Sequence, residues 1–157
     1  MSRHVFYSLH YDADRTRAEL IRKLPTLTPN LEAKPAEWAT ITRTGEFAIK
    51  RWFEQQLRGR SCTIVLIGAE TASRPWVRYE IERSWALNLG LVGVHIHHLK
   101  DPQGVQSEKG ENPFGPLTPF VTSYDPPETD SKLAYRHIAD NLAKWVDKAV
   151  ASRRSQP

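Results

Sequence analysis

The sequence predicts an α/β domain with a doubly wound, mainly parallel sheet and helices on both faces. The first observation is that apolar runs such as CTIVLIG (62–68) show no alternation of polar and apolar residues. Continuous apolar runs are typical of strands that are covered on both faces, as in parallel sheets. The second is that segments with helical spacing lie between these runs, and strands alternating with helices indicate right-handed crossover connections.

Three segments are expected to be strands: 4–11, 62–68 and 91–99. The first ends before Asp12, the second ends at a glycine, and the third ends before Lys-Asp-Pro. Two further segments, 36–42 and 119–124, are apolar enough to be additional strands.

Four segments place apolar residues at helical spacing: 14–24, 45–59, 74–90 and 130–153. Pro25 stops the first, and Gly59 is a suitable C-cap for the second. Pro75 lies in the first turn of the third, where its missing N–H does no harm, and Asp130 is a suitable N-cap for the fourth.

At 157 residues the chain is expected to form a single domain (1–157), with a basic tail at 154–157. Two segments are expected to be irregular, 25–44 and 100–119. Ligands of doubly wound folds bind beyond the carboxyl ends of the strands. The candidate site residues therefore lie after the first and second apolar runs and in the long loop after residue 99.

Composition excludes several classes of protein. The net charge of +4, from 22 Lys and Arg against 18 Asp and Glu, is interspersed along the chain. It favours anionic ligands such as nucleotides and does not predict nucleic-acid binding. The single cysteine, Cys62, lies in an apolar run, which excludes an internal disulfide framework and fits a reducing compartment. Without an apolar leader at the N-terminus or a run of about 20 apolar residues, a cytoplasmic protein with no membrane partner is expected.

Several common site motifs are missing. The chain contains no P-loop, no G-x-G-x-x-G after the first strand, and no G-x-S-x-G. A phosphoacceptor receiver domain would use Asp12 and Asp14, but it also needs an aspartate where the second apolar run ends in Gly-Ala. His95, His97 and His98, with His10 on a neighbouring strand, make a metal site conceivable. Packing or solvent exposure is the commoner role of such histidines, and no metal is predicted.

Glu80 is the principal candidate for chemistry. On a helix with about 100° per residue, Val77, Ile81 and Trp85 form one buried stripe. Glu80 lies about 60° outside the edge of this stripe, so its helical position predicts a residue at the boundary between core and solvent. One interpretation is a solvated acid that the helix dipole favours. The other is a site residue, because this helix begins after the carboxyl end of a strand and Trp76 lies one turn before Glu80.

Four stretches carry a family resemblance: HVFYSLHYD, EFAIKRWFEQQLRGRSCTIVLIGAETASRPWVRYEIERS, GLVGVHIHHLKD and KGENPFG. They occur in order over residues 4 to about 115 and resemble the ThsB-type TIR-like domain of the Thoeris anti-phage defence system. The most specific pieces are TIVLIGAETASRPWVRYEIERS and KGENPF. Beyond residue 116 the match is weaker.

The resemblance implies a flavodoxin-like (TIR-like) fold and, for active members, cleavage of NAD at the nicotinamide–ribose bond. Products include cyclised ADP-ribose isomers that signal to an effector. The catalytic glutamate of the WVRYEI motif corresponds to Glu80 and not to Glu82. Phe6, Ser8 and His10 match the segment that lines the family's pocket, and Asn112 matches a loop position near it.

The residues are compatible with that chemistry. Nicotinamide leaves as a neutral molecule, so one carboxylate is enough and no cofactor or metal is expected, with NAD as the substrate. Glycoside hydrolases generally need a second carboxyl to protonate their leaving group. Trp76, and also Trp38 or Trp52, could stack on the nicotinamide or adenine ring, and Arg74 or Arg78 could contact the pyrophosphate. Whether water or an adenine nitrogen attacks the ribose is not determined.

Two other interpretations stay open. The chain could be an interaction module that assembles with itself through TIR contacts, or with a defence or signalling protein. It could also bind a nucleotide without turning it over. Nicotinamide release from NAD separates the enzyme from both alternatives.

Overall fold

A computed structural model describes residues 3–156 and shows a five-stranded, all-parallel sheet with strand order β2-β1-β3-β4-β5. The strands are β1 (Arg3–Ser8), β2 (Leu27–Pro29), β3 (Cys62–Ile67), β4 (Gly90–His95) and β5 (Ser123–Tyr124). The expected doubly wound, flavodoxin-like α/β class is confirmed. The three expected strands are present, each shorter at its carboxyl end than the apolar run in the sequence.

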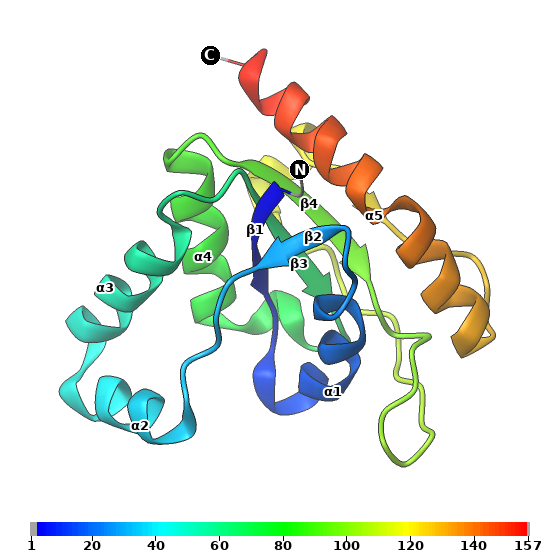
Figure 1. The fold of residues 1–157 in the computed structure, drawn as a ribbon, viewed down its shortest axis with the longest axis horizontal. Coiled ribbons are helices and arrows are strands. Elements are labelled where there is room, and N and C mark those ends of the chain that lie inside the picture. Colours follow the sequence, from blue (N-terminus) through cyan, green and yellow to red (C-terminus); the bar gives the residue numbers. More distant parts are fainter. Residues whose placement is uncertain (1–2, 157) are drawn as a thin grey trace.

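Five α-helices surround the sheet: α1 (Tyr11–Arg22), α2 (Pro35–Thr44), α3 (Glu46–Leu57), α4 (Pro75–Ala86) and α5 (Ser131–Arg154). One core cluster joins α1 and α5 to β1, β3 and β4. Two others lie on the opposite face, where α4 packs on β3 and β4 and α3 packs on β1. Figure 1 shows this three-layer arrangement, with α2 outside α3.

The segment 36–42 is helical, and the prediction of a strand there was wrong. Pro35 lies in the first turn of α2, and no residue of this helix is fully buried. Trp38 and Ile41, three residues apart, face α3 and pack against its aromatic side chains. The apolar content that suggested a strand is therefore the contact stripe of a surface helix. Residues 25–44 are correspondingly less irregular than expected, since they contain β2 and α2.

Two other boundaries differ from expectation. In 119–124 only Ser123 and Tyr124 form a strand, because residues 115–120 form a 3-10 helix. The helix expected over 74–90 ends at Ala86, and Asn88 adopts a left-handed conformation with φ 62°. Asparagine tolerates this conformation better than most residues, so it turns the chain into β4.

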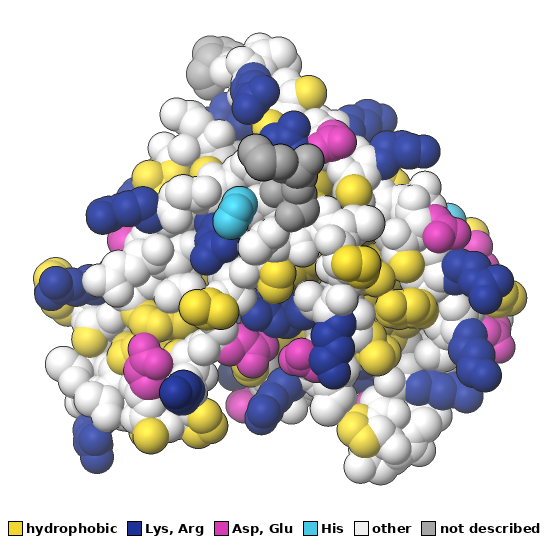
Figure 2. Space-filling model, viewed as in Figure 1, with side chains coloured by type: hydrophobic (Ala, Val, Ile, Leu, Met, Phe, Trp, Pro, Cys, Tyr) yellow, Lys and Arg dark blue, Asp and Glu magenta, His cyan; other side chains and the backbone are white. Residues whose placement is uncertain are grey.

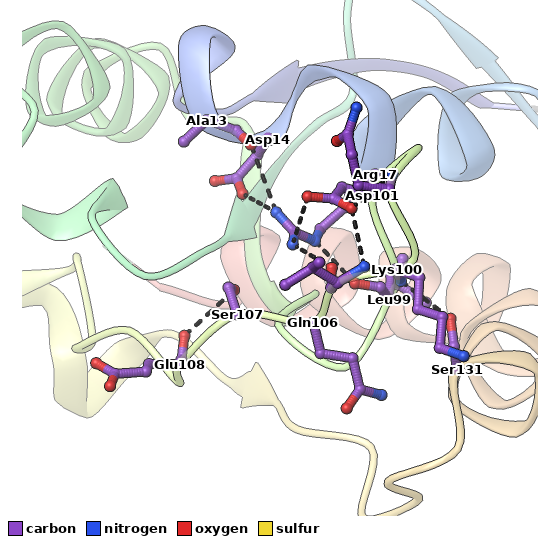
Figure 3. A network of polar contacts seen from close by, with 12 residues as sticks. Ala13, Asp14, Arg17, Leu99, Lys100, Asp101, Gln106, Ser107, Glu108 and Ser131 are labelled. Atoms are coloured by element: carbon purple, nitrogen blue, oxygen red, sulfur yellow. Dashed lines mark hydrogen bonds and ion pairs between the residues drawn. The ribbon is translucent and has the colours of Figure 1, made fainter.

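The long connection after β4 is held to α1 by a buried arginine (Figure 3). Arg17 Nε donates to the carbonyl of Leu99 at 2.8 Å, and Nη2 donates to the carbonyl of Val105 at 2.8 Å. Its guanidinium also lies 3.4 Å from Asp14 Oδ1 and 4.0 Å from Asp101 Oδ2. Arg17 is thus one of the side chains that hold a loop with little regular structure of its own.

Cys62 is fully buried in β3, as expected for a small apolar residue, and burial raises the pKa of its thiol to about 12. Among residues 3–156, no helix has both the length and the apolar character needed to cross a membrane. Figure 2 shows basic and acidic side chains interspersed on the face in view.

Candidate active site

A cavity of about 620 Å³ lies at the carboxyl end of β1. It is bounded by the start of α1, the segment between β2 and α2, the aromatic side of α3, and the first two turns of α4. The chain runs from β1 outward to β2 and then returns to β3 on the other side of β1. Doubly wound sheets form their ligand crevice at such a reversal of strand order. The cavity therefore lies where the fold class predicts a site.

Glu80 lines this cavity and is buried, with 5% of its surface exposed. The helical phase placed it at the boundary of the buried stripe, so burial is a correction to that expectation. The reason is that the first two turns of α4 also pack beside β1, where Trp76 and Tyr79 join the cluster of Phe6, which covers a side of the helix that the stripe leaves out. Glu82 is exposed. Of these two glutamates, only Glu80 lines the cavity.

Burial raises the pKa of the Glu80 carboxyl well above its ordinary value, because the charged form loses its hydration. The Ser8 hydroxyl acts in the opposite direction, but weakly. Ser8 is fully buried at the end of β1, and its Oγ makes no hydrogen bond of normal length and angle. The Glu80 carboxyl is therefore free to interact with a ligand.

Aromatic side chains form one wall of the cavity. Phe53 of α3 is at its centre, with ring centroids 5.2 Å from Trp52, 5.6 Å from Trp76 and 6.2 Å from Trp38. Phe6 of β1 completes the cluster, 6.5 Å from Phe53 in an edge-to-face contact. All five rings line the cavity. They are therefore both core residues and a surface on which a planar ring can stack.

The mouth of the cavity is charged. Arg15, Lys34 and Arg74 are exposed cations that line it, and Glu32 and Asp12 are the acidic residues there. Three cations around one opening favour an anionic group at that position.

Of the two arginines proposed for a pyrophosphate, the structure brings only Arg74 to the cavity. Arg78 is exposed and not among the lining residues, and its Nε is 3.4 Å from the carbonyl of Ala72.

The other predicted site residues divide into two groups. Phe6, His10 and Trp76 line the cavity with Glu80, and Ser8 lies directly behind the carboxyl. Asn112 does not line it. Its Oδ1 accepts a hydrogen bond from the Phe114 amide at 2.8 Å, so the side chain serves the turn before the 3-10 helix at 115–120.

Sequence reasoning missed the segment between β2 and α2 as part of the site. Asn30, Glu32 and Lys34 all line the cavity. The available signal was Pro29 followed by Asn30, since proline ends strand pairing and asparagine commonly satisfies backbone groups nearby.

The histidines at the end of β4 and just after it lie apart from the cavity. His95 and His97 are buried with ring centroids 5.8 Å apart, and His97 Nε2 lies 4.0 Å from Asp125 Oδ1. Burial lowers the pKa of both imidazoles. In the described part of the chain, no group of three or more His, Cys, Asp or Glu side chains is placed to hold a metal ion.

Comparison with known proteins shows the family of this chain. Residues 6–101 match the family model "Thoeris protein ThsB, TIR-like domain". A curated relative from Bacillus cereus (strain MSX-D12), named "Putative cyclic ADP-D-ribose synthase ThsB1", is 36% identical over 119 residues. The match covers 73% of this chain and 62% of the relative, so the chain spans under two thirds of that protein. The matched region contains the end of β1, all of β3 and β4, and all of α4 with Glu80, and the chain belongs to the ThsB-type TIR-like domain family.

Proposed function

We propose that the chain cleaves NAD at the bond between nicotinamide and ribose, with Glu80 as the catalytic carboxylate. The observation that carries the proposal is the position of Glu80. It is a buried acid in a cavity with aromatic walls, at the sheet edge where this fold binds ligands.

The proposed reaction needs one carboxylate. The bond between ribose C1′ and the pyridinium nitrogen breaks, and its electron pair goes to the nitrogen, so nicotinamide leaves neutral. The ribose passes through an oxocarbenium-like state, whose positive charge the Glu80 carboxylate stabilises. A nucleophile then forms the new bond to C1′ and loses its proton. Water gives ADP-ribose, and an adenine nitrogen of the same molecule gives a cyclic ADP-ribose.

The raised pKa of Glu80 fits this role. In the free cavity the proton compensates for the lost hydration of the carboxylate. A bound pyridinium brings a positive charge close to the carboxyl and favours its ionised form. The positive charge of the substrate thus acts against the effect of burial on the Glu80 carboxyl.

The rest of the cavity supports a dinucleotide as the ligand. The wall formed by Trp38, Trp52 and Trp76 offers ring faces and edges to nicotinamide or adenine. Arg74, with Lys34 at the mouth, offers cations to the pyrophosphate. The name of the Bacillus cereus relative indicates a cyclic ADP-ribose product for that protein, and we extend it to this chain as part of the proposal.

We also propose that the product is a signal for a separate effector in anti-phage defence. Self-association through TIR contacts is a further proposal. Phe47 and Leu31, each 80% exposed, lie at the start of α3 and just before α2, next to the segments that bound the cavity. Exposed aromatic and leucine side chains at that position suit a contact that closes the cavity.

The test is incubation of the purified chain with NAD at several protein concentrations, followed by mass spectrometry. We expect nicotinamide together with either cyclic ADP-ribose or ADP-ribose, which differ by one water. Binding of NAD without nicotinamide at every concentration would instead support the nucleotide-binding alternative. No binding and no product would favour the interaction module.

A further inference from the structure

The segment Asn30–Lys34, between β2 and α2, forms one wall of the cavity without regular structure of its own. Asn30, Glu32 and Lys34 line the cavity. Parallel pairing of β2 with β1 ends at the Val5–Pro29 position. Beyond this position the Asn30 side chain replaces a backbone carbonyl as the hydrogen-bond acceptor for β1. Its Oδ1 accepts a hydrogen bond from the Tyr7 amide at 3.0 Å. The position of this wall therefore depends on side-chain contacts.

Arg22, in the last turn of α1, supplies most of those contacts. Nη1 donates to Asn30 Oδ1 at 3.1 Å, Nη2 donates to the Asn30 carbonyl, and Nε lies 3.3 Å from Glu32 Oε1. The guanidinium also lies over the ring of Tyr7, 5.6 Å from its centroid. Every nitrogen has a partner on the segment, and only 9% of the side chain is exposed. Such a fork of donors cannot be reproduced by the single ammonium of lysine.

The contacts continue to the cavity itself. Glu32, held by Arg22, is also coupled to Tyr11: burial, together with the neighbouring Glu32 carboxylate, raises the pKa of the Tyr11 hydroxyl. Tyr7 and Tyr11 line the cavity, but Arg22 does not. Arg22 thus joins β1, α1 and the wall segment from behind, out of reach of a ligand.

We propose that Arg22 is a positioning residue that holds the wall Asn30–Lys34 in its ligand-binding position and so sets the affinity of the cavity for its nucleotide. The proposal deepens the proposed function and, for its kinetic part, rests on it. Because Arg22 acts through the wall and not on the reacting atoms, its loss affects KM and leaves kcat nearly unchanged.

The test compares Arg22→Lys with Arg51→Lys, a matched control at an exposed arginine of α3 outside the cavity. Amide exchange is followed by NMR at Tyr7, whose N–H donates to Asn30, and at Ile64 in the centre of β3. We expect Tyr7 to exchange about tenfold faster in Arg22→Lys only, because the loss of hydrogen bonds from a charged donor loosens Asn30. Ile64 should exchange as in the wild type, which separates local loosening from a general loss of stability.

The kinetic arm uses NAD with the same proteins. Arg22→Lys is expected to raise KM about tenfold, with kcat within about twofold of the wild type. Adding Asn30→Ala to Arg22→Lys should raise KM little further, because both substitutions remove the same contacts. Tyr7 exchange equal to that of Arg51→Lys would overturn the proposal, as would a loss in kcat at unchanged KM. If the wild type releases no nicotinamide, the proposed function fails, while faster Tyr7 exchange in Arg22→Lys still supports the positioning of the wall.

Discussion

Two connections flank the carboxyl edge of the sheet, and α1 holds each of them with a buried arginine. Arg22 holds residues 30–34 after β2, and Arg17 holds residues 99–105 after β4. In Figure 1 they lie on either side of α1. An arginine of α1 holds both connections, but the first connection borders the cavity and the second does not.

The two connections differ in what occupies the carboxyl edge of the sheet beneath them. On the β4 side, Gly110 contacts the end of β3 so closely that a Cβ there would lie 1.9 Å from the carbonyl oxygen of Gly68. The loop backbone itself occupies the crevice. On the β1 side, the wall segment stays away from α4, and aromatic rings with Glu80 enclose an open volume instead. One side of the edge is packed, and the other can bind a ligand.

The largest expected effect is on the open side. Glu80→Gln keeps the shape of the side chain but removes the charge that stabilises the oxocarbenium-like state. Nicotinamide release from NAD should fall about 10³-fold, with the thermal unfolding transition still cooperative. Glu82→Gln, at an exposed position of the same helix, is the matched control and should retain wild-type turnover. Near wild-type release by Glu80→Gln would remove the basis of the enzymatic proposal.

On the packed side, the expected effect of a substitution is a loss of stability. Arg17→Ala removes two hydrogen bonds to loop carbonyls and leaves the buried Asp14 carboxyl without its neighbouring cation. The free energy of unfolding, measured with denaturant, should fall by about 3 kcal/mol. Arg51→Ala, at an exposed site, should change it by less than about 0.5 kcal/mol. A similarly small change for Arg17→Ala would show that the loop contacts contribute little.

The pH dependence of stability should distinguish Glu80 from exposed acids. Its pKa is higher in the folded chain than the ordinary value of 4.5, so the folded state binds this proton more tightly than the unfolded state. Its stabilising effect is complete below pH 4.5 and is lost as pH rises through the folded pKa. Glu80→Gln should therefore gain stability over the wild type as pH rises above 4.5, by up to about 1.4 kcal/mol per pH unit within that window. A difference that stays constant with pH would contradict the burial of the carboxyl.

The smallest effect is expected at Asn112, on the packed side. Its side chain caps a turn and does not line the cavity. Asn112→Ala should change KM for NAD by less than about twofold, measured by steady-state nicotinamide release. A tenfold rise would mean that the ligand extends from the open side to the connection after β4.

Much of this protein follows from local sequence patterns. The apolar runs predict β1, β3 and β4, and helical spacing predicts α1, α3, α4 and α5 to within a few residues. The WVRYEI motif, through its family resemblance, singles out Glu80, and the spacing of one helical turn places Trp76 beside it. These features depend on residues that are close in the chain, so periodicity and motif spacing are enough to find them.

The tertiary structure alone decided the rest. Trp38 and Ile41 become a helix stripe only because α3 presents aromatic rings to them, and Glu80 is buried only because the first turns of α4 pack beside β1. The wall of the cavity depends on contacts such as Tyr7 to Asn30, which are 23 residues apart. Sequence periodicity shows on which face of its own helix or strand a side chain lies. Burial and cavity shape depend instead on which other elements pack against that helix or strand.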